Sequence, residues 1–287
     1  MTNTSLFKGT KNILKENNVH LKRRLGQNYL IDDFKREKIL NFGELNKNDR
    51  ILEIGPGIGT LSLKIAEKVK KLTVVEQDVK IFNILSRRID ELGINNVELI
   101  NNDALKVNFP KFNKTISNLP YKISSPITFK LLEHDFDLGI LTYQKEFVLR
   151  MIGKVDTKNY SRLTAMLHFK TKIEFLDDLP PNSFFPQPKI QSMVIKLNPK
   201  KDEEFKKYEK EYTQVSKALF QHKNKKIMNA LMDSRVVLGH EDKKEIRRFL
   251  DKISNDDNVN KLLNQRVIKT PPEKIFALSK QLKPLLK

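Results

Sequence analysis

The chain of 287 residues contains no cysteine. Disulfide bonds, thiolate nucleophiles, iron–sulfur clusters and zinc sites with cysteine ligands are therefore excluded, and a reducing compartment fits this composition. The chain also lacks an apolar run of about 18 residues, so we expect no transmembrane helix. Residues 1–20 have no uninterrupted apolar core of the kind that marks a secretory signal. We therefore expect a cytoplasmic protein that does not bind membranes.

Acidic side chains are few relative to basic ones. Lysine and arginine number 54 against 35 aspartates and glutamates, which gives a formal net charge of +19. A protein this basic commonly binds a polyanion, and nucleic acid is the first candidate. From charge alone, a compositional bias toward lysine is the alternative. The five histidines are scattered without the spacing of metal ligands, so we expect no metal site.

Short apolar segments alternate with helical patterns through the first half of the chain. The segments expected to form strands are 50–54, 72–76, 97–101, 115–119 and 138–144. Strands that alternate with helices predict an α/β fold with a parallel, doubly wound, Rossmann-like sheet. Right-handed crossovers then bring the carboxyl ends of the strands to one edge, where ligands bind.

Three parts are expected along the chain. Residues 1–20 have a coil-like composition and are interpreted as a loose N-terminal arm. Residues 21–199 form the doubly wound domain, which ends with an alternating strand at 192–199. Residues 200–287 are highly charged and helical, and we expect them to form a smaller C-terminal domain that binds RNA.

A glycine-rich loop follows the first predicted strand, in the segment EIGPGIG at 53–59. Glycine permits the close approach of a ligand, and the N-terminus of the next helix would direct N–H groups toward it. Glu76 ends the second strand, where a carboxylate accepts hydrogen bonds from both ribose hydroxyls.

Three interpretations of this loop compete. A nicotinamide dinucleotide prefers G-x-G-x-x-G, whereas Gly55, Gly57 and Gly59 follow the spacing G-x-G-x-G. That spacing suits S-adenosylmethionine, which has no pyrophosphate, and the charge of Glu53 also disfavours a pyrophosphate. A tight strand–helix turn without a ligand is the third interpretation.

Polar residues follow the third and fourth predicted strands. Asp103 could accept a hydrogen bond from the amino group of an adenine, or could simply cap the next segment. The tetrapeptide NLPY, at 118–121, is suited to methyl transfer to the amino group of adenine or cytosine. That nitrogen is a poor nucleophile, because its lone pair is delocalised into the ring.

Each residue of the tetrapeptide has a proposed part in this chemistry. The oxygen of Asn118 and the neighbouring backbone carbonyl would accept the hydrogens of the amine, and Pro120 would hold that carbonyl outward. Tyr121 would stack on the extruded base. In-line displacement would then need positioning and electrostatics but no strong base. An ordinary proline turn with a core tyrosine is the alternative.

Taken together, these segments resemble the ribosomal RNA adenine dimethyltransferase family from about Leu25 to the C-terminus. The matching segments are LGQNYLID (25–32), EIGPGIGTLS (53–62), VVEQD (74–78), NNDAL (101–105), NLPYKISSPI (118–127) and FFPQPKIQS (184–192). Their order makes the resemblance far more specific than any single motif. Two departures are Tyr29, where phenylalanine is usual, and a leader longer than in most members.

The resemblance implies S-adenosylmethionine as the cofactor and roles for matching residues. Asn28 and Leu30 would line the methionine end of the cofactor. The other cofactor-binding residues would be Gly55, Gly57, Glu76, Asp103, Ala104 and Asn118. The catalytic residues would be Asn118, Leu119, Pro120, Tyr121 and Phe184. Phe184, which we expect its flanking prolines to expose, would stack on the other face of the target adenine.

The resemblance also implies a substrate. Pro126 and the basic C-terminal part are similar to the branch that dimethylates two adjacent adenosines near the 3′ end of small-subunit rRNA, and the segment SSPITFKLL resembles archaeal members. We expect a monomer that acts on an immature 30S particle and aids small-subunit biogenesis. Expected RNA contacts are Lys22, Arg23, Arg24, His222, Lys223 and Lys225, although solvated basic segments are the alternative.

Three other functions remain open at this point. The first is the large-subunit branch of the family, which confers macrolide-type resistance. The second is a ribosome assembly factor for which methylation is secondary. The third is a nicotinamide oxidoreductase, which the glycine spacing disfavours.

Overall fold

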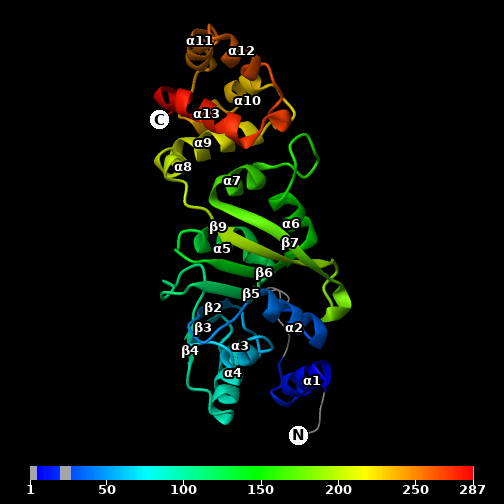
Figure 1. Cartoon of the computed structure of the whole chain (residues 1–287). Helices are drawn as coiled ribbons and strands as arrows, with labels where there is room; N and C mark the ends of the chain where they lie inside the picture. The colour runs from blue at the N-terminus through cyan, green and yellow to red at the C-terminus, as the bar shows by residue number, and fades with distance from the viewer. Residues whose placement is uncertain (1–4, 20–26, 287) are drawn as a thin grey trace. The chain divides into compact units, whose positions relative to one another are not determined.

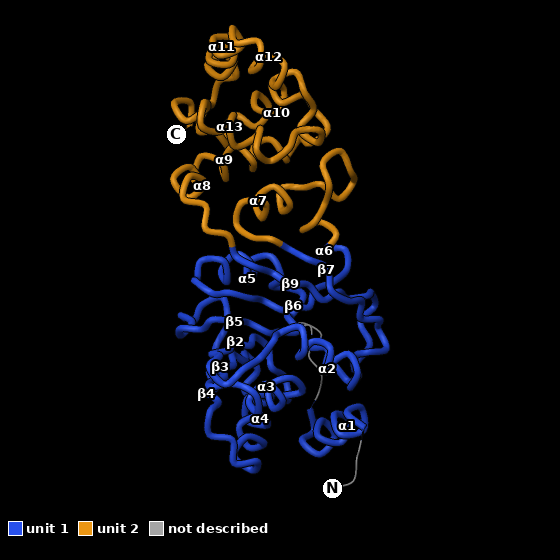
Figure 2. Tube along the Cα trace, in the orientation of Figure 1, with its two compact units in different colours: residues 1–148, 173–199 blue, residues 149–172, 200–287 orange. Residues whose placement is uncertain are grey.

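The computed structural model describes residues 5–19 and 27–286 (Figure 1). Contacts divide the chain into two compact units (Figure 2). Unit 1 consists of residues 1–148 and 173–199, and unit 2 consists of residues 149–172 and 200–287. Residues 149–172, expected from the sequence in the larger domain, thus group with the C-terminal residues. In the described ranges, no helix is both long enough and apolar enough to cross a membrane.

Unit 1 is built on a seven-stranded sheet with the order β4-β3-β2-β5-β6-β9-β7. The strands are β2 (Arg50–Ile54), β3 (Lys71–Glu76), β4 (Val97–Asn101), β5 (Lys114–Asn118), β6 (Leu138–Gln144), β7 (Thr171–Leu179) and β9 (Ser192–Pro199). The first five lie side by side in parallel pairs, as the sequence predicts. Their carboxyl ends therefore meet at one edge.

Strand β9 makes the sheet mixed. It pairs with β6 in the antiparallel direction, and the alternating pattern of residues 192–199 predicts a strand there without giving its direction. The connection from β7 to β9, residues 180–191, contains only a short 3-10 turn and the strand β8. This connection contains no α-helix, the element that usually joins two parallel neighbouring strands.

The helices of the first half of the chain largely follow the predicted pattern. They are α2 (Asp33–Phe42), α3 (Ser62–Ala66), α4 (Val79–Glu91), α5 (Ser124–Leu131) and α6 (Lys145–Met151). Helix α2 begins after Asp32, whose carboxylate accepts a hydrogen bond from the N–H of Lys35 at 3.0 Å, and it ends at Gly43. The carboxylate of Asp32 thus satisfies a backbone N–H of the first helical turn.

Residues Leu6–Glu16 form helix α1, where the sequence predicts a loose arm. Leu14 is buried in an apolar cluster with Tyr29 and Ile58, together with residues of α4. The apolar residues of α1 come in two pairs seven positions apart, Leu6–Phe7 and Ile13–Leu14, which share one face of the helix but leave the five residues between them polar or small. Burial against the rest of unit 1 therefore adds stability that local propensity alone does not supply.

The described residues also form a second sheet, which has two strands. Strand β1 (Tyr29–Leu30) pairs in the antiparallel direction with β8 (Phe184–Phe185), so that Leu30 is opposite Phe184. Each strand is too short to show a period-2 pattern, so neither is predicted from the sequence. The pairing joins a segment near the start of the chain to the proline-rich connection.

Unit 2 is helical. Its helices are α7 (Arg162–Lys170), α8 (Glu203–Lys207), α9 (Glu209–Phe220), α10 (Ile227–Asp233), α11 (Lys243–Ile253), α12 (Asp257–Leu263) and α13 (Pro272–Leu282). Two buried tyrosines tie residues 149–172 to the C-terminal helices. The hydroxyl of Tyr160 donates to the carbonyl of Thr270 at 2.7 Å, and that of Tyr212 donates to the carbonyl of Ala165 at 2.9 Å.

Candidate active site

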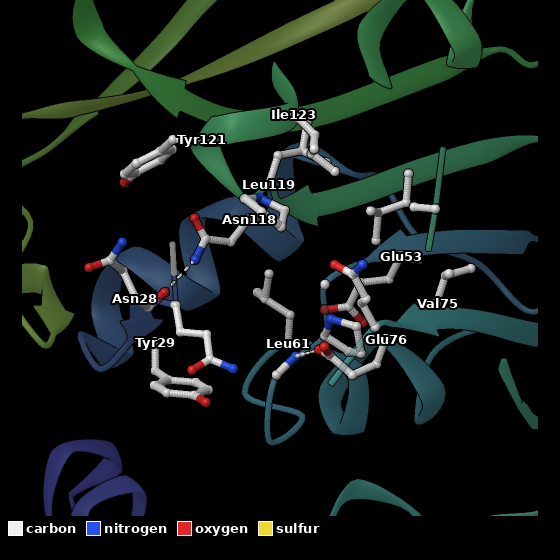
Figure 3. A pocket seen from close by; sticks show the side chains of 18 of the residues that line it. Asn28, Tyr29, Glu53, Leu61, Val75, Glu76, Asn118, Leu119, Tyr121 and Ile123 are labelled. Atoms are coloured by element: carbon white, nitrogen blue, oxygen red, sulfur yellow. Dashed lines mark hydrogen bonds between the residues drawn. The ribbon is translucent and has the colours of Figure 1, made fainter. Parts of the chain in front are cut away.

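A cavity of about 310 Å³ lies in unit 1 at the carboxyl ends of β2, β3 and β5 (Figure 3). It is lined mainly by segments 27–30, 53–57, 75–77, 102–104 and 118–123. These segments contain every residue predicted to bind the cofactor, namely Asn28, Leu30, Gly55, Gly57, Glu76, Asp103, Ala104 and Asn118. They also contain the tetrapeptide 118–121. The fold thus brings two predicted sites into one cavity.

Two glycines of the loop are required by geometry. Gly55 has φ +68°, and a Cβ atom there would lie 3.1 Å from Cγ of Pro120. Gly57 has φ +58°, and a Cβ atom there would lie 2.7 Å from Cε1 of Tyr29. Residues with side chains rarely adopt these φ values. The loop therefore fits between β1 and the tetrapeptide only because both positions lack a side chain.

Glu76 lies at the end of β3 with its side chain almost fully buried. Its Oε1 accepts a hydrogen bond from the N–H of Asp78 at 2.9 Å, and its Oε2 accepts one from the N–H of Gly57 at 3.3 Å. Burial raises the pKa of this carboxyl, and these backbone donors oppose the rise. The carboxylate is thus held rigidly at the wall of the cavity, where the sequence predicts a ribose ligand.

Glu53 is a second acidic residue of the cavity. It is 2% exposed, and its Oε2 has no hydrogen-bond partner among the residues that the structure describes. Burial raises the pKa of Glu53 to about 8; the hydroxyl of Ser62 opposes this rise, and the nearby charge of Glu76 adds to it. From sequence, Glu53 is expected to disfavour a pyrophosphate, but it is not among the predicted binding residues. Its position near the end of β2, two residues before Gly55, is the signal that could have found it.

Asp103 and Ala104 form the wall that follows β4. The Oδ1 of Asp103 accepts a hydrogen bond from the N–H of Leu105 at 2.9 Å, so this residue caps the turn as the structural alternative predicts. Asp103 nevertheless lines the cavity, and so does Ala104, which is buried. The cap and the ligand interpretation are therefore compatible.

Asn118 lies at the end of β5, and its side-chain amide is oriented by one contact. Its Nδ2 donates to the carbonyl oxygen of Asn28 at 2.9 Å. Its Oδ1 is buried and has no hydrogen-bond partner within the described part of the chain. Figure 3 shows this oxygen on the side of the amide away from Asn28. An unsatisfied acceptor at this depth costs free energy, so it is suited to a ligand that donates a hydrogen.

Tyr121 is held at both of its ends. It begins the 3-10 turn Tyr121–Ile123, and its carbonyl accepts a hydrogen bond from the hydroxyl of Ser124 at 2.8 Å. Its hydroxyl forms a hydrogen bond with the Oγ of Ser192 at 2.5 Å, and burial raises its pKa. The ring lines the cavity in a fixed orientation. It can therefore present an aromatic face without losing rotamer entropy on binding.

Phe184 does not have the environment that the sequence predicts. It is fully buried in the main core cluster, which also contains Leu30, and it is not among the residues that line the cavity. The expectation that prolines expose Phe184 is wrong, because β8 pairs with β1 and turns this side chain inward. Phe185 is half-buried and contacts Phe7 of α1, with ring centroids 6.2 Å apart.

The predicted RNA contacts fall into two groups. Lys22, Arg23 and Arg24 lie outside the described residues. His222, Lys223 and Lys225 lie in the turn between α9 and α10, and not on a helix as expected. Lys223 donates to the carbonyl of Lys158 at 3.1 Å, and Lys225 forms a salt bridge with Asp233 at 2.7 Å. A role of this turn in binding phosphate stays a prediction.

Comparisons with known proteins indicate the family of the chain. The family model described as ribosomal RNA adenine dimethylase matches residues 18–270. A relative from Methanothermobacter thermautotrophicus, described as a probable ribosomal RNA small subunit methyltransferase A, is 48% identical over 231 residues, which are 80% of this chain and 82% of the relative. A relative of the same description from Methanosphaera stadtmanae is 46% identical over 94% of this chain and 96% of its own length.

A solved structure supports the same conclusion. The crystal structure of a dimethyladenosine transferase from Plasmodium falciparum superposes with a TM-score of 0.77 and 28% identity, covering 88% of this chain and 97% of that chain. The family model spans most of the chain and both relatives exceed 40% identity. The chain therefore belongs to the ribosomal RNA adenine dimethylase family, whose members are methyltransferases that use S-adenosylmethionine.

Proposed function

We propose that the enzyme transfers methyl groups from S-adenosylmethionine to the 6-amino groups of two adjacent adenosines near the 3′ end of small-subunit rRNA. The observation that carries this proposal is the buried, unpartnered oxygen of Asn118 in the same cavity as the glycine loop. The description of the archaeal relatives as small-subunit methyltransferases supports this branch of the family over the large-subunit branch.

The residues of the cavity fit S-adenosylmethionine chemically. Glu76 would accept hydrogen bonds from the ribose hydroxyls, and segment 102–104 would contact the adenine. Asn28 and Leu30 would line the methionine end. Glu53, a buried carboxyl with an unpartnered oxygen, suits a ligand that carries positive charge. When bound, the cofactor supplies a methyl group on a positively charged sulfur.

The residues of the tetrapeptide would prepare the target amine. Asn118 would accept one hydrogen of the amine, and the backbone carbonyl of Leu119 would accept the other. As the nitrogen becomes tetrahedral and positive, its N–H groups become stronger donors, so both contacts strengthen in the transition state. The hydrogen bond to Asn28 fixes the orientation of the Asn118 oxygen in advance. Preorganised acceptors of this kind lower the barrier without a strong base.

Binding of the base would depend on stacking. Tyr121 is proposed to stack on the extruded adenine, because its ring is fixed and lines the cavity. A direct stacking role for Phe184 stays a prediction that its burial disfavours. The net charge of +19 supports association with rRNA through phosphate contacts. We further propose that the enzyme acts as a monomer in the cytoplasm, on an immature 30S particle.

The test is mass mapping of methylation sites. Undermethylated 30S particles and, separately, 50S particles are incubated with the enzyme and labelled S-adenosylmethionine. We expect two adjacent adenosines near the 3′ end of 16S rRNA to gain two methyl groups each. Methylation of 50S particles in place of 30S particles would assign the enzyme to the large-subunit branch. An absence of methylation on 30S particles, with binding intact, would favour an assembly role.

A further inference from the structure

Lys130 connects two loops of the cavity through helix α5. The helix begins immediately after the 3-10 turn that contains Tyr121, and Lys130 lies near its C-terminal end. The Nζ of Lys130 donates to the carbonyl oxygens of Ala104 at 2.7 Å and of Val107 at 2.5 Å. Lys130 thus holds the segment that follows β4, which forms the adenine side of the cavity.

The environment of Lys130 indicates that its contacts are built into the fold. The ammonium also lies 4.4 Å from the centre of the Phe109 ring, which is a cation–π distance. Partial burial lowers its pKa, while the charges of Glu133 and Asp103 oppose this effect. A desolvated ammonium requires compensation, and here two backbone carbonyls and one aromatic face provide it.

Helix α5 is itself held at its N-terminal end and in its middle. The hydroxyl of Ser124 holds the carbonyl of Tyr121, and the hydroxyl of Thr128 forms a hydrogen bond with that of Tyr143 on β6 at 2.6 Å. The helix is therefore rigidly placed between the tetrapeptide and segment 102–107. Among the described residues of the helix, Lys130 is the one whose side chain donates hydrogen bonds to this segment.

We propose that Lys130 is a positioning residue, which fixes the adenine side of the cofactor cavity relative to the tetrapeptide that holds the target amine. This inference rests on the proposed function and deepens it. Segment 102–107 has no helix or strand of its own. Backbone hydrogen bonds from Lys106 and Val107 to the carbonyl of Asp103 order the turn itself, and Lys130 supplies its anchor to α5. Without this anchor, cofactor binding would have to fix the position of the turn, and that cost would weaken affinity.

The predicted effect differs between binding and catalysis. Once the cofactor is bound, it orders the segment itself, so the rate at saturating cofactor should change little. Lys130→Met should therefore raise both the dissociation constant and KM for S-adenosylmethionine about 10-fold, as expected for the loss of charge-assisted hydrogen bonds. It should leave kcat near the wild-type value. Lys130→Arg should restore most of the affinity, because it keeps the charge and the donors.

Lys106 offers a matched control on the same segment. Its side chain is exposed, and Lys106→Met removes the same charge from the same neighbourhood without removing a hydrogen bond between α5 and the segment. We expect this variant to bind S-adenosylmethionine as the wild type does. Calorimetry on the full chain and methylation kinetics on 30S particles supply the two readouts.

A double-mutant cycle with Asp103→Ala tests whether Lys130 influences cofactor affinity through segment 102–107. If Lys130 acts through segment 102–107, the effects of Lys130→Met and Asp103→Ala on affinity should be less than additive.

Should the Met variant fail to fold, Lys130→Gln is measured in its place, and a smaller rise in the dissociation constant is expected. Unchanged affinity in the Lys130 variants, or an equal loss in Lys106→Met, overturns the inference. Failure of the wild type to bind S-adenosylmethionine would instead overturn the proposed function.

Discussion

The side-chain amide of Asn118 donates to the backbone carbonyl of Asn28, and this 2.9 Å hydrogen bond spans ninety positions of the sequence. It joins the tetrapeptide to the segment that precedes β1. Because the amide nitrogen is occupied, the oxygen of Asn118 is left as the group that faces a ligand. The orientation of the acceptor is thereby set by the backbone of another segment of the cavity.

Replacement of Asn118 should affect turnover far more than binding. Asn118→Ala removes an acceptor whose contact is strongest in the transition state, and such a loss typically lowers the rate about 10²–10³-fold. Phosphate contacts elsewhere should keep RNA affinity nearly intact. Single-turnover methyl transfer on 30S particles, together with filter binding, measures the two effects. Delivery of two methyl groups to each adenine at near wild-type rate would contradict the proposed mechanism.

Replacement of Glu76 should weaken cofactor binding. Glu76→Ala removes a carboxylate proposed to accept two hydrogen bonds from the ribose, and it should cost about 1.5–3 kcal/mol of binding free energy. Glu91→Ala, which removes an exposed carboxylate at the end of α4, is the matched control and should have no effect. Isothermal titration calorimetry measures both. An unchanged affinity for S-adenosylmethionine in Glu76→Ala would exclude Glu76 from the site.

The pKa of Glu53 predicts that cofactor affinity depends on pH. Burial raises this pKa to about 8, so the carboxyl of the free enzyme is largely protonated at neutral pH. A positively charged cofactor favours the carboxylate, and binding below the raised pKa must therefore release a proton. Affinity should rise with pH from about 6 and level off above about 8.

Glu53→Gln serves as the reference for this titration. It should remove the part of the pH dependence that Glu53 causes, whereas ionisation of the cofactor itself affects both proteins equally. Calorimetry in buffers of different ionisation enthalpy counts the protons released. Identical pH profiles for the wild type and Glu53→Gln would show that Glu53 does not titrate on binding.

Alanine substitutions at Gly57 and Gly93 separate the cost of backbone strain from the cost of a steric clash. Both residues have positive φ, +58° and +64°, so an alanine at either position should cost about 1–2 kcal/mol of stability. At Gly57 the new Cβ would also meet the ring of Tyr29, whereas at Gly93 nothing lies within 4 Å. Gly57→Ala should therefore lose more stability, and it alone should lose cofactor affinity. Equal unfolding free energies for the two variants would mean that Tyr29 moves aside at little cost.

The basic segment before β1 should contribute to the salt dependence of RNA binding. If Lys22, Arg23 and Arg24 contact phosphates, their joint replacement should make the slope of log affinity against log salt shallower by about 2–3. Filter binding to 30S particles at several salt concentrations gives this slope. A slope equal to that of the wild type would identify the segment as a solvated one.

The cavity could be predicted from sequence because its residues follow parallel strands of one sheet. In a sheet of parallel strands, residues that follow different strands gather at one edge, so Glu76, Asp103 and Asn118 had to lie near the glycine loop. The position of each residue then depends only on where one strand ends. This prediction needs only the strands and their direction. Apolar segments of the sequence mark the strands, and their alternation with helical patterns indicates that they are parallel.

Other features depend on contacts between distant segments, which no local pattern contains. Helix α1 has only two short apolar pairs in its sequence and is stabilised by burial of Leu14 against Tyr29 and Ile58. Phe184 is buried because two-residue strands pair across the chain. The proton affinity of Glu53 arises from complete burial next to Glu76, which the residue type alone does not reveal.

The pairing of β1 with β8 also governs when the site can be completed during protein synthesis. The residues that line the cavity have all been translated once Ile123 is made. Strand β1, however, has β8 as its partner, and β8 ends at Phe185. A nascent chain that stops short of this point carries the glycine loop and the tetrapeptide, yet leaves the backbone of Tyr29 and Leu30 unpaired. Competence to bind a ligand therefore emerges late in translation, at about the time that unit 1 itself becomes complete.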